Sequence, residues 1–356
     1  MIQRILSLFM SFITMLFSMI GGLIHDDPDP FSLLTKEWRQ MVQSNYDEFI
    51  SEVADSDSRI PIIVSTDQHG AVSANSAFYK YIDSVVDWNK ISKIINLGDT
   101  VSNSYNEKEL SAYLTATECL PGGKRIEVIG NHDRTGLSDA EGAEAARRYF
   151  RTSGAVYSDD GKAFVVEDTQ FNIRYLAVDP KENPWGYESG ALRTPQADFI
   201  INELSKDDLT DIVLISHPYL FKDNILRRDG SAFTGSEYFI GSRNVCTEAR
   251  ESFIDMLAAR RNKTAGVLLD CDGVEHPYDF TACRSDFLMT LHGHHHTEGY
   301  ETKNGITEFM FQSMTMDNGQ NNEPNCFYFA YIDTQTKTFK CWKNVVGYDA
   351  WSISIA

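Results

Sequence analysis

The stretch "IPIIVSTDQHG" (60–70) is an apolar run that ends in polar residues, and its pattern decides the fold. Three further segments repeat it: "ISKIINLGDT" (91–100), "RIEVIGNHD" (125–133) and "DIVLISHPY" (211–219). A short apolar run bounded by polar residues is typical of a buried strand that leads into a loop. Helical spacing between these runs predicts alternating strands and helices, the pattern of an α/β sheet with parallel strands.

The expected helices fall between and around these strands. An N-terminal helix over 31–53 is expected to pack on the body, and another begins at Thr194 with Pro195 in its first turn. Beyond residue 300 the segments become strand-like, with a hairpin turn expected at 333–337. The remaining helices are expected near 77–89, 106–118, 139–150 and 246–261.

Polar residues gather at the predicted carboxyl ends of these strands. In open α/β sheets, ligands bind beyond the carboxyl ends. A fifth segment, "LHGHHHTEG" (291–299), adds four histidines within five positions. A site with two divalent ions needs a bridging carboxylate and about three further nitrogen or oxygen ligands for each ion. The strand ends supply such groups in Asp67, His69, Asp99, Asn131, His132, Asp133, His217, His294 and His296.

Five short motifs in this set resemble those of the calcineurin-like metallophosphoesterase superfamily. They read D-Q-H (67–69), G-D (98–99), G-N-H-D (130–133), S-H (216–217) and G-H-H-H (293–296), in the family order. One such motif is weak, but five in order are specific, and they cover roughly 58–315. The resemblance implies an α/β/β/α sandwich of mixed sheets flanked by helices.

The resemblance also implies a role for each motif residue. Asp67, His69 and His296 would hold the first ion, and Asn131, His217 and His294 the second. Asp99 would bridge the two ions. His132 would be the general acid or position the phosphate, and Asp133 would orient its ring. The ions expected are Mn, Fe or Zn, because imidazole and carboxylate suit them and no thiolate is in the set.

The implied activity is hydrolysis of phosphomonoester, phosphodiester or pyrophosphate bonds, with a metal-bridging hydroxide as nucleophile. Ser102 replaces the tyrosine of purple acid phosphatases, and Asn103 the arginine of protein Ser/Thr phosphatases. Neither branch is therefore indicated. The expected substrate is a small or lipid-linked phosphate ester. Two alternatives stay open, namely a catalytically silent extracytoplasmic binding or scaffold protein on the same fold, and an extracytoplasmic nuclease.

The net charge of this 356-residue chain is −19, which repels nucleic acid and makes a nucleic-acid partner less expected. Residues 5–24 carry no charge, and at 1.5 Å per residue they would span roughly 30 Å as a helix. Arg4 precedes this stretch and carboxylates follow it, so an N-terminal hydrophobic helix is predicted as a membrane anchor or signal segment (1–25), with the body extracytoplasmic. A linker and helix (26–57) and one catalytic domain (58–356) would follow.

Several other features admit two interpretations. The six cysteines could form disulfides, with Cys326 and Cys341 facing each other across a hairpin, or be buried thiols. The stretch "VLLDCDGV" (267–274) matches the nucleophile strand of haloacid-dehalogenase phosphatases, but a surface turn is the favoured interpretation. His276 is expected at the surface. Residues 221–244 are long for a connection, so Arg227 and Arg228 could meet a second phosphate or simply be solvated.

Overall fold

The computed structural model describes residues 31, 34–70, 72–102, 104–150, 152–179, 192–221, 224–233, 244–314 and 326–355. The predicted N-terminal anchor or signal segment (1–25) lies outside these residues, as does Asn103. Within the described ranges, no helix combines the length and apolar character that crossing a bilayer requires. The predicted anchor, the domain boundaries and the extracytoplasmic location therefore stay predictions.

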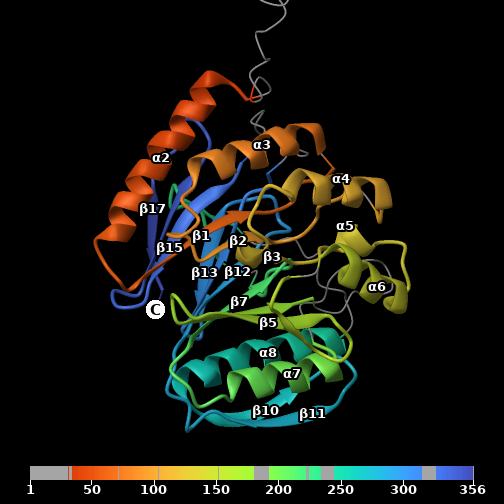
Figure 1. Cartoon of the computed structure of the whole chain (residues 1–356). Helices are drawn as coiled ribbons and strands as arrows, with labels where there is room; N and C mark the ends of the chain where they lie inside the picture. The colour runs from red at the N-terminus through yellow and green to blue at the C-terminus, as the bar shows by residue number, and fades with distance from the viewer. Residues whose placement is uncertain are drawn as a thin grey trace, which may run out of the picture.

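Two mixed sheets lie face to face at the centre of the molecule (Figure 1). In the first sheet, β1, β2 and β3 are parallel and the C-terminal strands are antiparallel to their neighbours. The predicted hairpin at 333–337 is confirmed between β15 and β16. The strand order is β17 (Trp351–Ser354), β16 (Thr338–Lys343), β15 (Tyr328–Asp333), β1 (Arg59–Ser65), β2 (Lys93–Asn96) and β3 (Arg125–Glu127).

The second sheet has nine strands. Its centre is parallel, because β6, β7, β12 and β14 run in one direction, while both edges are antiparallel. The order is β4 (Val156–Tyr157), β5 (Ala163–Asp168), β6 (Ile173–Val178), β7 (Asp211–Ser216), β12 (Phe287–His292), β14 (Ile306–Met310), β13 (Gly299–Lys303), β8 (Ile225–Leu226) and β9 (Ala232–Phe233).

Helices cover the outer face of each sheet (Figure 1). The first sheet is covered by α2 (Lys36–Ala54) and α3 (Val72–Val85), and the second by α7 (Thr194–Leu204) and α8 (Asn244–Asn262). The predicted helices are thereby confirmed, including the proline at the start of α7. The remaining short elements are α4 (Glu107–Thr117), η1 (Gly122–Lys124), α5 (Asn131–Arg134) and α6 (Asp139–Tyr149).

Three apolar clusters fill the interfaces between these four layers. In β1, Ile60, Ile62 and Val64 point into the cluster between the sheets, while Ile63 points outward to the helices. Successive side chains of a strand face opposite sides, so a strand that is covered on both sides must be apolar at every position. This is why the predicted strands appear in the sequence as continuous apolar runs, and why their polar residues are displaced to the ends.

The "VLLDCDGV" stretch ends in the predicted surface turn, with residues 272–274 exposed, but the predicted surface position of His276 was wrong. β10 (Ala265–Leu269) pairs with β11 (Glu275–Asp279) in a separate two-stranded sheet. Asp270 is fully buried and His276 is only 6% exposed. Burial follows from a contact that the sequence does not reveal, because α7 packs against the hairpin and contributes Thr194 and Asp198 as partners.

No disulfide is formed by the five cysteines whose side chains the structure describes. Cys271, Cys283, Cys326 and Cys341 are buried and Cys119 is partly buried. The buried-thiol interpretation is therefore confirmed for these five, and the proposed pairing of Cys326 with Cys341 was wrong. Cys341 sits opposite Ala330 in the ladder, so Cys326 is too far along the chain to face it.

Candidate metal centre

The predicted ligands meet where the two sheets share an edge. Strands β1, β2 and β3 of one sheet and β7 and β12 of the other all end there, and a ligand-bearing loop follows each of them. Three overlapping groups of titratable side chains result, each with its ligand atoms within 4.8 Å of one another. The groups are Asp67–His69–His296, His69–Asp99–His132 and Asp99–His217–His294.

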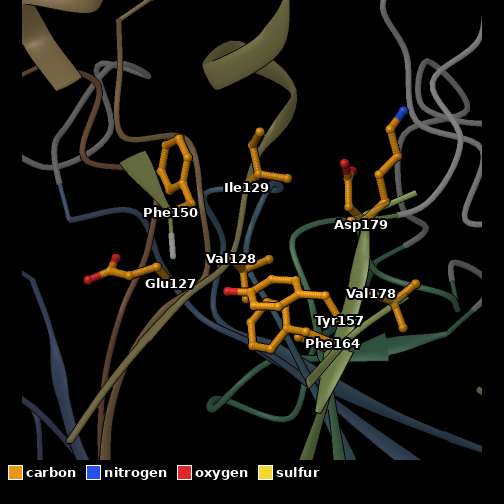
Figure 2. Close-up of a pocket in the computed structure, with 11 residues that line it drawn as sticks. Glu127, Val128, Ile129, Phe150, Tyr157, Phe164, Val178 and Asp179 are labelled. Carbon is orange, nitrogen blue, oxygen red and sulfur yellow. The ribbon is translucent and has the colours of Figure 1, made fainter. Parts of the chain in front are cut away.

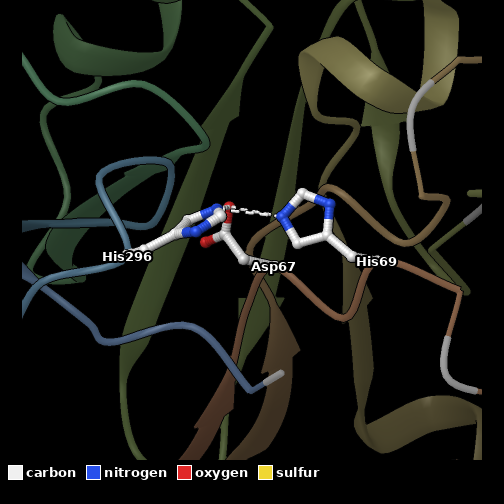
Figure 3. A group of neighbouring side chains, drawn as sticks. All are labelled: Asp67, His69 and His296. Carbon is white, nitrogen blue, oxygen red and sulfur yellow. Dashed lines mark hydrogen bonds and ion pairs between the residues drawn. The ribbon is translucent and has the colours of Figure 1, made fainter. Parts of the chain in front are cut away.

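The first group joins the loop after β1 to the loop after β12 (Figure 3). His69 Nε2 lies 2.9 Å from His296 Nε2, and His296 Nε2 lies 3.1 Å from Asp67 Oδ1. Two ligands at right angles on one ion, each about 2.1 Å from it, are separated by about 3.0 Å. The spacing and the donor types in this group therefore fit a first-row divalent ion.

The third group, Asp99–His217–His294, is joined by Asn131, and together these residues come from four loops. His217 Nε2 lies 3.1 Å from Asp99 Oδ2, 3.2 Å from Asn131 Oδ1 and 3.0 Å from His294 Nδ1. These four residues offer two imidazole nitrogens, a carboxylate and an amide oxygen, which also suit a first-row ion. Asp99 belongs both to this group and to the one with His69 and His132, so its carboxylate lies between the two halves of the site.

Backbone carbonyls set the orientation of two of the rings. His217 Nδ1 donates to Leu97 O at 2.7 Å, and His69 Nδ1 donates to Ser102 O at 3.3 Å. A proton held on Nδ1 leaves the Nε2 lone pair of each ring directed at the cluster. This outer hydrogen bond is the usual way in which proteins fix the tautomer of a metal-binding histidine.

The electrostatics of the cluster keep its carboxyl groups ionised. Burial by itself raises the pKa of Asp67, but the rings of His296 and His217 outweigh it and hold that pKa well below the usual range. Burial opposes His217 in the same way at Asp99, whose pKa is lowered to about 2. Burial lowers the pKa of His294 to about 3. Ionised carboxylates and neutral imidazole are the forms that bind metals.

Backbone strain is concentrated at the predicted ligands. Of the nine non-glycine residues with positive φ in the described chain, five belong to the predicted ligand set. Left-handed backbone costs such residues about 1–3 kcal/mol each and persists where the surroundings enforce it, often at functional sites. The five are Asp67 (53°), His69 (46°), Asp99 (53°), His294 (71°) and His296 (54°).

The glycines of the motifs allow the loops to approach closely. A Cβ on Gly130 would overlap the Asp99 carboxylate and backbone nitrogen, and a Cβ on Gly293 would overlap Thr66 Oγ1 and lie 2.8 Å from Asp67 Oδ2. The motif glycines thus have a steric explanation, because any side chain there would push two ligand loops apart.

His132 borders the open side of the site. Its side chain is 31% exposed, while its Nε2 lies 3.8 Å from Asp99 Oδ2 and its ring stacks edge-on to His69 at 4.9 Å. Its backbone N–H donates to Asp99 Oδ1 at 2.8 Å. A ring so placed can reach both the cluster and a molecule entering from solvent.

The predicted contact between Asp133 and the His132 ring is not what the structure shows. Asp133 accepts backbone N–H bonds from Gly130 and Thr100 at 2.8 Å and from Val101 at 3.1 Å. His132 Nδ1 has no hydrogen-bond partner among the described residues. Asp133 therefore ties the loop after β2 to the start of α5, and acts on the loops rather than on the ring.

A buried network behind His217 was missed from the sequence. Ser216 Oγ lies 2.9 Å from His292 Nδ1, and His292 Nε2 lies 3.1 Å from Glu308 Oε2. Glu308 accepts N–H bonds from Leu220 at 2.6 Å and Phe221 at 3.2 Å. The network holds the loop after His217 against the strands. Local sequence patterns could not predict this network, because Glu308 lies 88 positions from Leu220.

A second missed contact fixes α5, which carries Asn131 and His132. Arg134 forms an ion pair with Asp179 at the end of β6, and both side chains are about 5% exposed. The pair connects α5, which follows β3 of the first sheet, to the end of β6 in the second sheet. Asp179 also borders a mainly apolar pocket between β3 and β6 (Figure 2), whose volume of about 20 Å³ holds roughly one water and excludes a substrate.

A scan against protein families and a search of curated proteins found no match. Similar solved structures include a conserved Streptococcus pneumoniae protein described as a predicted phosphoesterase, with 13% identity over 83% of this chain and 98% of that one, at a TM-score of 0.36. GAP50, described as the anchor in the inner membrane complex of Plasmodium, has 9% identity over 83% and 88%, with a TM-score of 0.47. PhoD has 11% identity over 83% and 68%, with the same TM-score. These scores are too low to assign a function.

The fold and the site together define a mixed α/β protein with a strand-end cluster of residues that could hold metal ions. Within that class, the chain resembles the calcineurin-like metallophosphoesterase superfamily, through its five motifs and their shared place at one sheet edge.

Proposed function

We propose that this chain is a metal-dependent phosphoesterase that binds two divalent ions. The observation that carries the proposal is the convergence, from five separate loops, of seven acceptor-bearing side chains with ligand-like spacings. When bound, the ions would supply Lewis-acid stabilisation of phosphoryl oxygens and acidify water at the site. Asp67, His69 and His296 would hold one ion, and Asn131, His217 and His294 the other, with Asp99 shared.

The charge of the site favours a phosphate substrate even though the whole chain is acidic. Only two carboxylates, Asp67 and Asp99, stand among the proposed ligands, and His294 is neutral because burial lowers its pKa to about 3. Two divalent ions therefore leave the centre with net positive charge. A local positive field in a partly closed site attracts anions despite the net charge of −19.

His132 is the residue best placed to transfer a proton. It is the most solvent-accessible member of its group, and its ring adjoins both Asp99 and His69. In the proposed reaction His132 protonates the leaving oxygen of the ester or positions the phosphoryl group. A general acid contributes about 10²–10⁴-fold in rate.

The test is hydrolysis of an aryl phosphomonoester and the matching diester by the full chain, supplied with Mn²⁺ and then Zn²⁺. His132→Ala is expected to lower kcat by about 10²–10⁴-fold with metal stoichiometry unchanged. Asn131→Ala is expected to weaken metal binding as well. His276→Gln, which removes a buried histidine outside the site, is the control and should retain activity.

Two outcomes would contradict the proposal. If the wild type does not bind metal, the proposed metal site does not exist. Tight binding of two metal ions with no turnover of any phosphate ester, in wild type and variants alike, would favour a catalytically silent binding protein on the same fold.

A further inference from the structure

The hairpin of β8 and β9 lies at the sheet edge where the proposed ligands are located. β8 is antiparallel to β13, β13 is antiparallel to β14, and β14 is parallel to β12. β8 therefore runs in the same direction as β12, which ends at His292. The residue that follows β8 is Arg227, so it emerges at the same edge as the histidine-rich loop.

Aromatic contacts connect Arg227 to that loop. The guanidinium carbon of Arg227 lies 4.3 Å from the centre of the Phe233 ring, and the Phe233 ring lies 5.3 Å from the ring of His295. His295 stands between the proposed ligands His294 and His296. A single aromatic side chain, Phe233, thus lies between the Arg227 charge and the histidine-rich loop. Arg227 is itself exposed to solvent.

The neighbouring arginine is held quite differently. Arg228 Nη2 donates to Glu298 Oε1 at 2.8 Å, and Arg228 also donates to Asp349 O. Its guanidinium lies 5.1 Å from the Trp351 ring centre. Arg228 therefore fastens the hairpin to the C-terminal segment, so the interpretation of a simply solvated side chain was wrong for Arg228.

Among the described residues, Arg227 forms no comparable ion pair, and its charge contributes only in a minor way to lowering the pKa of Asp229 in the same turn. Within the part of the chain that the structure describes, no carboxylate oxygen lies within 4.0 Å of its guanidinium nitrogens. Asp229, the nearby acidic residue in the turn, accepts hydrogen bonds from the backbone N–H and hydroxyl of Ser231. In a chain of net charge −19, an exposed guanidinium held on an aromatic ring at the site edge is positioned for an anion from outside.

We propose that Arg227 binds a second anionic group of the substrate, so that this protein prefers phosphate esters with two neighbouring anionic groups, such as diphosphates. This inference rests on the proposed phosphoesterase function. The first anionic group would occupy the metal centre and the second would meet the planar guanidinium, which can donate two parallel hydrogen bonds to phosphate oxygens. The Phe233 ring limits the positions that the guanidinium can adopt.

The test compares phenyl phosphate with phenyl diphosphate, which share the same aryl group and differ by one phosphoryl group. Arg227→Ala is expected to lower the ratio of kcat/KM for the diphosphate over the monophosphate by about tenfold, with Arg227→Lys intermediate. Arg228→Ala is the matched control and should leave this ratio unchanged. Thermal melting of each variant verifies that it is folded.

A binding measurement distinguishes failure of this inference from failure of the proposed function. Methylphosphonate and methylenediphosphonate are not hydrolysed, and calorimetric titration into the Mn²⁺-loaded full chain measures the same preference without turnover. A loss of about tenfold in relative diphosphonate affinity in Arg227→Ala supports the inference even if no ester is hydrolysed. An unchanged preference in Arg227→Ala, an equal change in Arg228→Ala, or no diphosphonate preference in the wild type would overturn it.

Discussion

Two clusters of carboxylate and imidazole in this protein have opposite chemistry, and each contains a fully buried aspartate. The ligand cluster is the set of seven proposed metal ligands at the sheet edge. The hairpin cluster consists of Asp270 and His276 on the β10–β11 hairpin with Thr194 and Asp198 of α7. Both contain the residue types of a metal site, so residue type alone does not distinguish them.

The difference lies in where the protons are. In the hairpin cluster, Asp270 accepts bonds from two backbone N–H groups, from Thr194 Oγ1 at 2.5 Å and from His276 Nε2 at 2.9 Å. His276 Nδ1 then donates to Asp198 at 2.8 Å. Each acceptor faces a donor. In the ligand cluster, by contrast, His69 Nε2 and His296 Nε2 face each other at 2.9 Å, where they can share at most one proton. Acceptor atoms that converge on one point favour the binding of a cation. Donors and acceptors that are already paired with one another stabilise the fold without a ligand.

The largest expected effect is a loss of metal binding and activity when the ligand cluster is altered. Asp99→Asn removes the charge shared by both halves of the ligand cluster, so metal binding should fall by more than the about 10–100-fold that loss of an outer partner costs. Turnover should fall with it. The measurement is metal stoichiometry by elemental analysis together with kcat/KM. Asp270→Asn, the same change in the hairpin cluster, should leave both values near wild type, and equal losses in the two variants would erase the distinction.

The second prediction concerns the hairpin cluster, where a substitution should affect stability rather than activity. Asp270→Ala leaves His276 and two backbone N–H groups buried without their acceptor, and should lower the free energy of unfolding by about 3–5 kcal/mol. Urea unfolding of the full chain measures this change. Activity at low temperature, where the variant stays folded, should be close to wild type. A stable Asp270→Ala variant would show that the hairpin cluster contributes little to folding.

The smallest effect is a pH dependence confined to the hairpin cluster. Burial lowers the pKa of His276, but its bonds to Asp270 and Asp198 outweigh burial and raise it above 6.5. A folded-state pKa above the unfolded value gives stability that is fully present below pH 6.5 and is lost as the pH rises through the folded value. The gap in unfolding free energy between wild type and His276→Gln should therefore narrow from pH 6 to pH 9. A gap that widened over this range would show that His276 is neutral in the folded protein.

Local patterns predicted much of the fold and most of the candidate site. The strand runs, the helices between them and the motif loops all depend on neighbouring residues, and the loops then meet because parallel strands end at one edge. The sequence could not predict contacts between distant segments. Glu308 behind His217, Asp179 beside Arg134, and the burial of Asp270 all arise from packing between elements far apart in the chain. The role assigned to Asp133 failed for the same reason, since its partners lie on two loops.

The left-handed backbone at five proposed ligands has a consequence for what substitutions this site can tolerate over evolutionary time. At such positions glycine and asparagine are accepted readily, whereas β-branched residues are penalised whatever their chemistry. A descendant that kept the fold but lost the ions would therefore be expected to accumulate glycine or asparagine at positions 67, 69, 99, 294 and 296. This chain has aspartate or histidine at all five, so its backbone carries a continuing cost that relaxed selection would be expected to remove.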